Sequence, residues 1–300
     1  MDFDVIIIGA GPSGLTAALY LGRANLKTLI LESTGSGGQL NYTYEVDNYP
    51  GFFGKGTELA EKMRTQALKF GGIFSSERVL EIKVLTGDIK LIKTRKNEYR
   101  AKSVIIATGA GPRLLGAEGE EQFKGLGVSY CATCDGAFFK DKTVLVAGGG
   151  NTAFEDALYL SKFCKAVYLI HRRDKFRASA TLVEKVKNNP KIIIRTNETI
   201  EKIQGESMVN SVVLKNVVSS ENTILDTSAV FVAAGRIPNS AIVKDILELD
   251  ENGYIVTDEN MRTSADGIYA VGDVRKTPLR QIITACADGA VAANDISMNI

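Results

Sequence analysis

Two cysteines and an aspartate near the middle of the chain have the types and spacing that redox chemistry requires. They stand in the run Cys131-Ala132-Thr133-Cys134-Asp135. A C-x-x-C pair beside βαβ units in a cytosolic protein is typical of a redox dithiol, and a short loop or helix start favours the thiolate. Asp135 is placed to give a proton to a leaving thiolate or to take one from an attacking thiol. We therefore predict that Cys131, Cys134 and Asp135 are the catalytic residues.

The alternative interpretation of a C-x-x-C pair is one half of a zinc site. The chain has four cysteines, one histidine (His171) and no second C-x-x-C. A closed four-ligand zinc site is hard to assemble from these residues. Cys164 and Cys286 lie in apolar contexts and are expected to pack in the interior. The sequence therefore favours dithiol chemistry and no metal.

A glycine-rich turn near the N-terminus predicts a first nucleotide site. An apolar strand at residues 3–8 runs into G-x-G-x-x-G, a helical pattern follows, and a second strand ends at Glu32. Such glycines allow a tight turn and a close approach of the backbone to a pyrophosphate, which meets the helix N-terminus. An acid at the end of the second strand accepts hydrogen bonds from the adenosine ribose. The predicted contacts are Gly9, Gly11, Pro12, Ser13, Gly14 and Glu32.

The same arrangement recurs later in the chain. A second apolar strand, 144–147, leads into a G-x-G-x-x-A turn that begins at Gly148, which is 139 positions after Gly9. The strand that follows, 166–170, reaches His171, which stands where Glu32 stands in the first copy. Two independent nucleotide sites are therefore predicted. The contacts expected at the second are Gly148, Gly150, Asn151, Thr152, Ala153 and His171.

The charges at the two strand ends predict which nucleotide each site binds. Glu32 suits a free ribose and would repel a 2′-phosphate, whereas His171 is followed by several arginines. Arginine matches phosphate geometry with two hydrogen bonds and stays charged. The alternative is a solvated basic face, but a position directly after a fingerprint strand favours phosphate binding. The second site is therefore predicted to prefer NADPH over NADH, through Arg172, Arg173 and Arg177.

Length and charge limit the class of protein. A chain of 300 residues favours two domains, and 36 basic against 35 acidic residues leave a net charge of +1. This balance gives no electrostatic reason to expect a nucleic-acid or membrane-surface protein. No stretch approaches the ~20 apolar residues of a membrane-spanning helix, and the first residues do not resemble a signal peptide. We expect a soluble, cytoplasmic protein with no nucleic-acid or membrane partner.

Two further segments support a flavin at the first site. The apolar strands at 104–107 and 230–233 close the two units in parallel ways, and the first ends in Thr108-Gly109. Near the C-terminus, the strand at 267–271 stops at Gly272-Asp273. A glycine there lets the backbone reach a ligand, and the acid can accept a hydrogen bond from a sugar hydroxyl. After two nucleotide fingerprints, this corner is expected to contact the ribityl chain of FAD.

Over its whole length the chain resembles the low-molecular-weight thioredoxin reductases. Besides the motifs above, the resemblance depends on residues 37–40 (Gly-Gly-Gln-Leu), residues 48–51 (Asn-Tyr-Pro-Gly) and Arg280-Gln281. It implies an α/β fold of the pyridine nucleotide-disulfide oxidoreductase type, with two Rossmann-like domains, the second inserted into the first. Residues 1–111 and 241–300 would form the FAD-binding domain, and 112–240 the NADPH-binding domain with the dithiol. Further FAD contacts would come from Gly38, Gln39, Leu40, Asn48, Asp273, Arg280 and Gln281.

The resemblance also implies a function. Reducing equivalents would pass from NADPH through FAD to the Cys131–Cys134 disulfide and on to thioredoxin, in a homodimer. Cys134 would be the sulfur nearest the flavin, and Cys131 would attack the thioredoxin disulfide. Arg236 stands where the family often has a histidine, and it is a further candidate for the phosphate site.

Two other functions remain open. One is a flavin reductase of the same fold that serves ferredoxin or a dedicated peroxidase, although relatives that act on ferredoxin lack the dithiol. The other is a catalytically silent nucleotide-binding sensor, which would bind FAD without NADPH-driven disulfide reduction. A sensor has no need of Cys131, Cys134 and Asp135 together, so their presence favours the enzyme.

Overall fold

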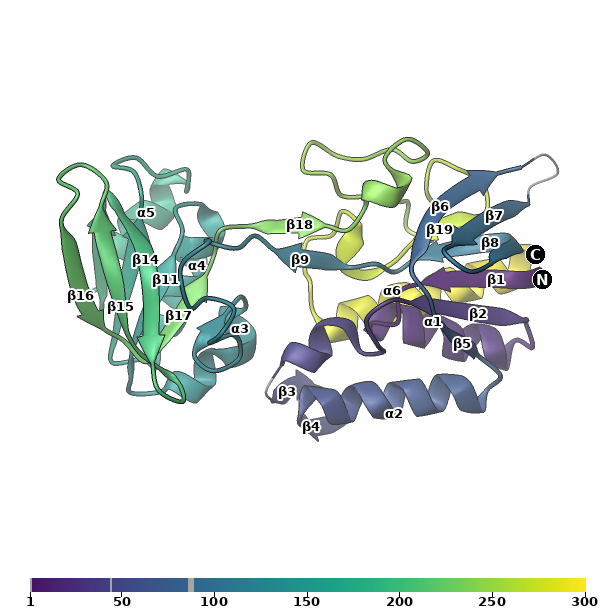
Figure 1. Ribbon diagram of the computed structural model, residues 1–300, viewed down its shortest axis with the longest axis horizontal. Helices are drawn as coiled ribbons and strands as arrows, with labels where there is room; N and C mark the ends of the chain where they lie inside the picture. The colour runs from purple at the N-terminus through teal and green to yellow at the C-terminus, as the bar shows by residue number, and fades with distance from the viewer. Residues whose placement is uncertain (1, 44, 86–88) are drawn as a thin grey trace. The chain divides into compact units, whose positions relative to one another are not determined.

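The computed structural model describes residues 2–43, 45–85 and 89–300 and divides into two compact units (Figure 1). The first unit contains Met1–Asn41, Tyr49–Gly111 and Ile237–Ile300. The second contains Tyr42–Asn48 and Pro112–Arg236. The chain passes between the units in two short strands that pair with each other, β9 (Ala110–Pro112) and β18 (Arg236–Pro238).

The chain returns from the second unit to the first between Arg236 and Ile237. This point is earlier in the chain than the junction at 240/241 that we expected. Hydrogen bonds explain the difference. The Asn239 side chain donates to the carbonyl of Thr108 at 2.8 Å, and its backbone N–H donates to the carbonyl of Gly109 at 2.9 Å. The Thr108 hydroxyl donates to the carbonyl of Asn239 at 2.7 Å. These bonds place the residues just before 241 in the first unit.

A mixed sheet forms the centre of the first unit. Its order is β5-β2-β1-β8-β7-β6, with β19 also beside β8. Strands β5, β2, β1, β8 and β19 run parallel, whereas β6, β7 and β8 form antiparallel pairs. The strand bounds are β1 (Asp2–Ile8), β2 (Thr28–Glu32), β5 (Ile73–Ser76), β6 (Val79–Val84), β7 (Lys90–Thr94), β8 (Glu98–Ile106) and β19 (Ile268–Ala270).

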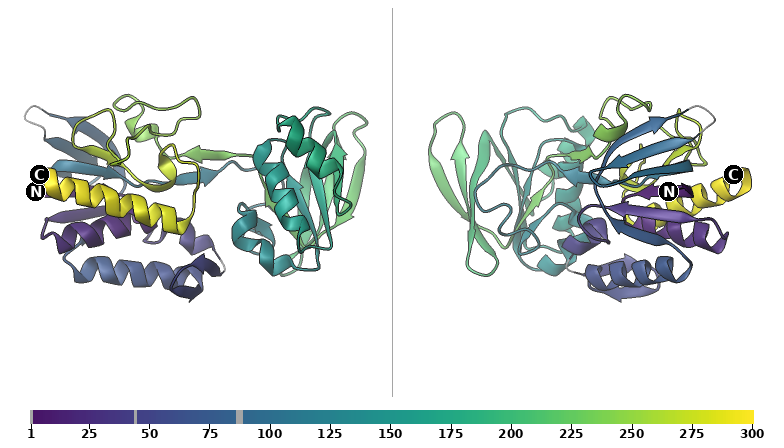
Figure 2. Two further views of the ribbon diagram at one scale, coloured as in Figure 1. Left: turned by 180° about the vertical axis from the view of Figure 1, so that it is seen from behind. Right: turned by 45° about the vertical axis from the view of Figure 1, so that its right-hand side comes forward.

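Three helices cover one face of this sheet (Figure 2). They are α1 (Pro12–Arg23), α2 (Gly56–Lys69) and α6 (Ile282–Asn299). Helices α1 and α6 pack so closely that a Cβ on Gly289 would overlap the carbonyl of Ser13. Shorter elements complete the unit: η1 (Gly38–Tyr42, whose last residue groups with the second unit), β4 (Phe52–Gly54), η3 (Ala241–Val243) and η4 (Gly272–Val274). Strand β3 (Val46–Tyr49) groups with the second unit except for Tyr49.

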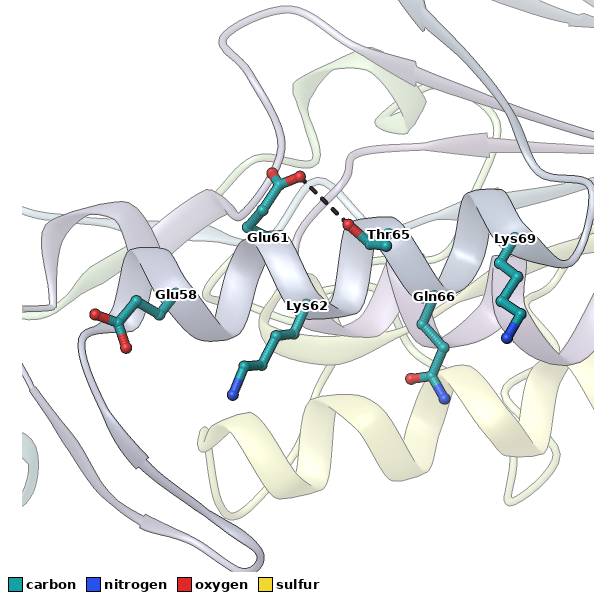
Figure 3. Close-up of a pocket in the computed structure, with 6 residues that line it drawn as sticks. All are labelled: Glu58, Glu61, Lys62, Thr65, Gln66 and Lys69. Atoms are coloured by element: carbon teal, nitrogen blue, oxygen red, sulfur yellow. Dashed lines mark hydrogen bonds between the residues drawn. The ribbon is translucent and has the colours of Figure 1, made fainter.

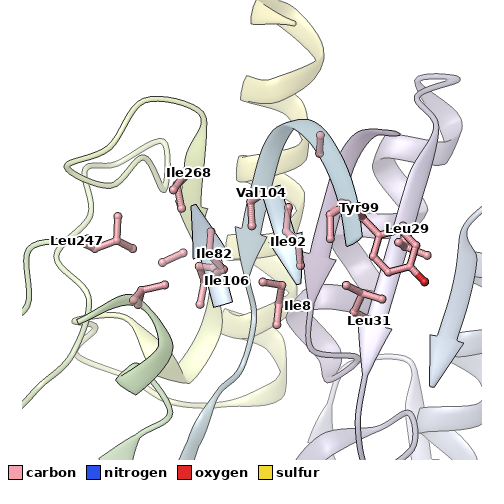
Figure 4. Close-up of a cluster of buried hydrophobic side chains, with 14 of the residues drawn as sticks. Ile8, Leu29, Leu31, Ile82, Ile92, Tyr99, Val104, Ile106, Leu247 and Ile268 are labelled. Carbon is pink, nitrogen blue, oxygen red and sulfur yellow. The ribbon is translucent and has the colours of Figure 1, made fainter. Parts of the chain in front are cut away.

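The alternating side chains of β1 supply both faces of the core. Val5 and Ile7 point toward the helices, and Ile6 and Ile8 pack in the cluster on the other face. This second cluster also contains Leu29, Leu31, Ile82, Ile92, Tyr99, Val104, Ile106, Leu247 and Ile268 (Figure 4). A strand buried on both faces explains why residues 3–8 are almost entirely apolar.

The second unit contains a parallel sheet of order β10-β17-β11-β12-β13 and an antiparallel sheet of order β14-β15-β16. Its strands are β10 (Val128–Ser129), β11 (Thr143–Ala147), β12 (Ala166–His171), β13 (Ile192–Thr196), β14 (Glu198–Gly205), β15 (Val209–Asn216), β16 (Asn222–Asp226) and β17 (Ala229–Val232). Its helices are α3 (Ala132–Asp135), η2 (Gly136–Phe139), α4 (Asn151–Ser161) and α5 (Ala180–Lys187).

The internal repeat predicted from the sequence is confirmed by strand register. Val5 lies opposite Thr28 in the β1–β2 pair, and Val144 lies opposite Val167 in the β11–β12 pair. Each member of the second pair is 139 positions after its counterpart in the first. The α/β class and the two Rossmann-like units are therefore confirmed. Among the helices of the described residues, none combines the length and apolar character needed to cross a membrane.

Candidate functional site

The predicted cysteine pair is joined by a disulfide at the start of α3, with a Cα–Cα distance of 5.3 Å. Cys131 is the N-cap residue of this short helix. Its carbonyl accepts hydrogen bonds from the backbone N–H groups of Cys134, at 3.2 Å, and Asp135, at 3.1 Å. The Thr133 hydroxyl lies 3.4 Å from the Cys131 sulfur. One helical turn thus holds both sulfurs and the carboxyl group together.

Asp135 is held by a residue that the sequence analysis did not identify. The Ser129 hydroxyl donates to Asp135 Oδ2 at 2.6 Å and accepts from the Cys131 backbone N–H at 3.1 Å. Burial raises the pKa of the Asp135 carboxyl; the Ser129 hydrogen bond opposes this effect, and the charge of Asp47 adds to it. A serine two residues before a cysteine has no distinctive sequence signal, so only the local fold identifies its role.

The first glycine turn joins β1 to α1 with the geometry that a pyrophosphate requires. Gly9 has a φ of +108°, and a Cβ there would overlap the carbonyl of Ala107. A Cβ on Gly14 would overlap the carbonyl of Gly9. Gly11, in contrast, caps α1 and has open space where a side chain would stand. The turn is therefore closed on its inner side and open at the helix N-terminus, where an anion can approach the backbone.

Glu32 lies at the end of β2 with its carboxylate over this turn. Its Oε2 accepts from the backbone N–H of Ala10 at 2.9 Å, and its Oε1 accepts from the backbone N–H groups of Ser33, at 2.7 Å, and Thr34, at 2.9 Å. These bonds fix the carboxylate beside the glycines. Pro12 occupies the first turn of α1, where its missing N–H costs no hydrogen bond.

Two segments that are distant in the sequence, around residues 38–39 and 272–273, lie beside the first glycine turn. The Gln39 side-chain amide donates to Asp273 Oδ2 at 3.1 Å and to the carbonyl of Ala110 at 2.9 Å. A Cβ on Gly38 would lie 3.2 Å from the Cα of Gly11. A Cβ on Gly272 would lie 2.7 Å from the hydroxyl oxygen of Ser13, which is buried. Residues predicted from three separate motifs thus lie around one turn.

The other residues predicted for the first site have varied surroundings. The Arg280 guanidinium lies 4.1 Å from the centroid of the Tyr254 ring, and its Nε is buried without a hydrogen-bond partner among the described residues. Gln281 caps α6 in a capping box with Thr284, and Leu40 is buried. Asn48 groups with the second unit. Thr108 and Gly109 bond to Asn239, as described above.

A buried ion pair that supports the Gly272-Asp273 corner was also not predicted from the sequence. Asp288 Oδ2 accepts from the backbone N–H of Gly272 at 3.0 Å. The Arg275 guanidinium donates to both Asp288 oxygens, at 2.8 Å and 3.0 Å. Both side chains are largely buried, with 15% and 11% exposed. An acidic residue within the apolar helix α6 is the sequence signal that could have indicated this pair, because a buried charge needs a partner.

The second glycine turn repeats the geometry of the first. The Gly148 backbone N–H donates to the carbonyl of Ile170 at 3.0 Å, and a Cβ there would overlap Ala233 and Ala153. Gly150 caps α4 and has open space where a side chain would stand. Both turns are thus open at their helix N-termini, although their sequences share few side chains.

The segment after β12 folds back over the second turn. The His171 ring lies so close to Gly149 that a Cβ there would overlap it. The Arg177 backbone N–H donates to the carbonyl of Gly149 at 2.8 Å, and Asn151 Oδ1 accepts from the backbone N–H of Ser179 at 2.9 Å. This segment therefore brings the predicted basic residues to the glycine turn.

The predicted basic cluster surrounds the one histidine of the chain. Burial lowers the pKa of His171, and the charges of Arg172, Arg173 and Arg177 lower it further. These three arginines and Thr152 are exposed. Positive charge thus gathers at the strand end, as the sequence predicted, with arginine side chains accessible to an anion.

Arg236 lies near an acid that the sequence analysis did not consider. Burial raises the pKa of Asp156, on α4, to about 7; the neighbouring Glu155 raises it as well, and the charge of Arg236 lowers it. Because the pKa of Asp156 lies near neutral pH, the charge of the region around Arg236 depends on pH.

The remaining cysteines are free and buried, as expected. The Cys164 thiol donates to the carbonyl of Phe139 at 3.3 Å, and burial raises its pKa to about 11. Burial also raises the pKa of the Cys286 thiol. Both groups are therefore protonated thiols at neutral pH and poor nucleophiles.

A surface hollow of about 730 Å³ follows α2 and is lined by Glu58, Glu61, Lys62, Thr65, Gln66 and Lys69 (Figure 3). The Thr65 hydroxyl donates to Glu61 at 3.3 Å. Its lining comes from one face of one helix and includes no residue predicted for the site. Because the hollow lacks convergent polar groups from several elements, we do not assign it a role.

Comparisons with known proteins agree with this arrangement. A family model described as pyridine nucleotide-disulphide oxidoreductase matches residues 3–289. A thioredoxin reductase of Peptoclostridium acidaminophilum is 48% identical over 299 residues, which cover 97% of this chain and 95% of that protein. A bifunctional thioredoxin reductase/thioredoxin of Mycobacterium leprae is 44% identical over 296 residues, which cover 97% of this chain and 64% of that protein.

A solved structure gives the same result. The crystal structure of thioredoxin reductase from Streptococcus pyogenes matches with a TM-score of 0.93 and 44% identity, over 99% of this chain and 97% of that one. Family membership implies an enzyme that uses a pyridine nucleotide and a disulfide. The chain therefore belongs to the pyridine nucleotide-disulphide oxidoreductase family and, within it, groups with the thioredoxin reductases.

Proposed function

We propose that this chain reduces the disulfide of a thioredoxin with electrons from NADPH, carried by FAD and the Cys131–Cys134 pair. The observation that supports this most strongly is the disulfide at the start of α3 with the buried Asp135 carboxyl beside it. The names of its relatives support the choice of substrate. In the Mycobacterium leprae relative, the name joins a thioredoxin reductase and a thioredoxin in one protein.

FAD is proposed for the first unit. Bound there, it would accept a hydride from the nicotinamide and return the electron pair to a disulfide. The open backbone at Gly11 fits a pyrophosphate, and the Glu32 carboxylate fits an adenosine ribose. Arg280 Nε is buried and has no hydrogen-bond partner among the described residues, so FAD could supply one. The Gln39–Asp273 hydrogen bond holds two further polar side chains of the predicted FAD site together.

NADPH is proposed for the second unit. The open backbone at Gly150 fits a second pyrophosphate. The exposed guanidinium groups of Arg172, Arg173 and Arg177 fit the 2′-phosphate, because arginine binds phosphate with two parallel hydrogen bonds. Arg236 is a further candidate contact, and its neighbour Asp156 would oppose phosphate binding where it is ionised.

The reduced dithiol would act by thiol–disulfide exchange. Asp135 takes the proton of the Cys131 thiol, and the resulting thiolate attacks the thioredoxin disulfide to form a mixed disulfide. Asp135 then gives its proton to the departing thioredoxin sulfur. The Cys134 thiolate attacks the Cys131 sulfur, which re-forms the Cys131–Cys134 disulfide, and the second thioredoxin sulfur takes up the proton that Cys134 lost. Burial favours the protonated carboxyl that the second step needs.

An anaerobic titration with NADPH tests the proposed path. The purified chain should show a flavin spectrum and take up two electron pairs, one at the flavin and one at the disulfide. The C131S/C134S variant should keep the flavin and take up only the first pair. Equal uptake by both proteins would contradict the proposed role of the dithiol.

We also propose that the chain works as a homodimer in the cytoplasm, as the family resemblance implies. Light scattering after size-exclusion chromatography should give twice the chain mass of 32.3 kDa. A mass of one chain across the working concentration range would contradict the dimer.

A further inference from the structure

The Ser129 hydroxyl connects the two ends of the dithiol motif. Ser129 ends β10 and is 6% exposed. Its Oγ lies 2.6 Å from Asp135 Oδ2, to which it donates, and 3.1 Å from the Cys131 backbone nitrogen, from which it accepts. A serine hydroxyl has one hydrogen to donate, so the carbonyl of Cys131, at 3.3 Å, is the weaker of two competing acceptors.

The two oxygens of the Asp135 carboxyl therefore differ. Oδ2 accepts the short hydrogen bond from Ser129, whereas Oδ1 is buried and has no hydrogen-bond partner within the described part of the chain. A charged oxygen that is buried without a donor is costly. Because Oδ2 already accepts a hydrogen, an added proton is best placed on Oδ1.

We propose that Ser129 is a positioning residue for the acid–base step: its hydroxyl holds Asp135 Oδ2 and directs the exchangeable proton to Oδ1. This inference rests on the proposed function, in which Asp135 moves a proton between two sulfurs. The S–H bond of Cys131 breaks as Oδ1–H forms. The Oδ1–H bond then breaks as the S–H bond of the departing thioredoxin sulfur forms.

The groups that face Asp135 determine the sign of the expected change. Burial raises the pKa of its carboxyl, and the charge of Asp47, in β3, raises it further. The Ser129 hydrogen bond opposes these effects because it stabilises the ionised carboxylate. Loss of the hydroxyl should therefore raise the pKa of Asp135.

The hydrogen bond can be tested without turnover. In the oxidised holoprotein labelled with ¹³C-carboxyl aspartate, D135N identifies the Asp135 signal. S129A should raise the pKa of Asp135 by about one pH unit, because hydrogen bonds to charged groups have this magnitude. S129T keeps a hydroxyl and should restore the wild-type pKa. S161A removes another buried hydroxyl, one that donates to the carbonyl of Leu158, and should leave it unchanged.

An unchanged Asp135 pKa in S129A would overturn the inference. The comparison of S129A with wild type tests the inference even if S129T does not fold. The functional part is tested by the pH profile of kcat/KM for thioredoxin. The limb of the profile that D135N abolishes should move to higher pH in S129A by the same amount as the pKa. A merely structural role would lower the rate equally at every pH, and that result would also overturn the inference. If the wild-type chain failed to reduce thioredoxin, the proposed function would be wrong while the pKa comparison still stood.

Discussion

In the proposed function, single residues give the two glycine turns their different nucleotides. The backbones of the turns are alike, since Gly11 and Gly150 both cap a helix beside open space. The difference lies at the strand ends, where one copy has the Glu32 carboxylate and the other has His171 with three arginines around it. An acid repels a 2′-phosphate and a guanidinium binds it. We therefore propose that side-chain charge rather than backbone shape selects the nucleotide.

The R172A/R173A variant tests this selection. It should raise the KM for NADPH about tenfold or more and leave the KM for NADH nearly unchanged, because each phosphate hydrogen bond lost is charge-assisted. Steady-state kinetics with both nucleotides measure the ratio. K185A/K187A removes the same charge from the exposed last turn of α5 and is the matched control. Equal losses for NADPH and NADH in R172A/R173A would remove the assignment.

At the scale of elements, side chains from separate segments hold the site in place. Helix α6 supplies Asp288, which holds the backbone of Gly272 and the Arg275 guanidinium. The corner in η4 therefore depends on a helix that begins ten residues further along the chain. In the second unit, β10 supplies Ser129 to α3 in the same way.

The D288N variant tests the support of the Gly-Asp corner. Loss of a charge from a largely buried pair should destabilise the chain by about 3 kcal/mol and weaken flavin binding roughly tenfold. Urea unfolding and flavin fluorescence measure the two effects. The matched control is D295N, on the same helix, where Asp295 bonds to Arg262 at 2.7 Å and 2.8 Å. If D295N loses flavin as readily as D288N, general destabilisation explains the result and the corner has no special support.

A second carboxylate, that of Glu77, bonds to several segments of the first unit, and we expect it to make the stability of the protein depend on pH. Glu77 accepts hydrogen bonds from the hydroxyls of Ser75, Thr94 and Tyr99 and from the Asn97 amide. Burial alone would raise the pKa of Glu77, but these bonds outweigh it and lower the pKa from 4.5 to about 2. A folded-state pKa below the unfolded value stabilises the protein above pH 4.5, and this contribution is lost as pH falls toward about 2.

The E77Q variant should therefore be less stable at neutral pH by about 2 kcal/mol, because it loses hydrogen bonds to a charged group. The difference from wild type should shrink as pH falls from 4.5 toward about 2. Urea unfolding over a pH series measures it. E81Q, at a half-exposed glutamate of β6 that pairs with Lys83, should change stability little at any pH. A difference for E77Q that is constant with pH would contradict the assignment.

At the scale of the whole molecule, the sequence predicts what depends on local pattern. Glycine turns between apolar strands are local, so both Rossmann-like units and their 139-residue repeat were predictable. The C-x-x-C spacing is local too, and the disulfide is present. Contacts between separate segments were not predictable: the sequence did not reveal that Ser129 bonds to Asp135 or that Asp288 holds Gly272. The second passage between the units was misplaced because the bonds of Asn239 join segments far apart in the chain.

Thioredoxin-dependent oxidation of NADPH tests the central claim most directly. The wild-type chain should consume NADPH when an oxidised thioredoxin is present. Free thiols should appear on the thioredoxin in stoichiometric proportion to the NADPH oxidised. The C131S/C134S variant should keep its flavin and its reduction by NADPH, yet lose thioredoxin reduction by about a thousandfold or more. Thioredoxin reduction at the wild-type rate by C131S/C134S would contradict the account.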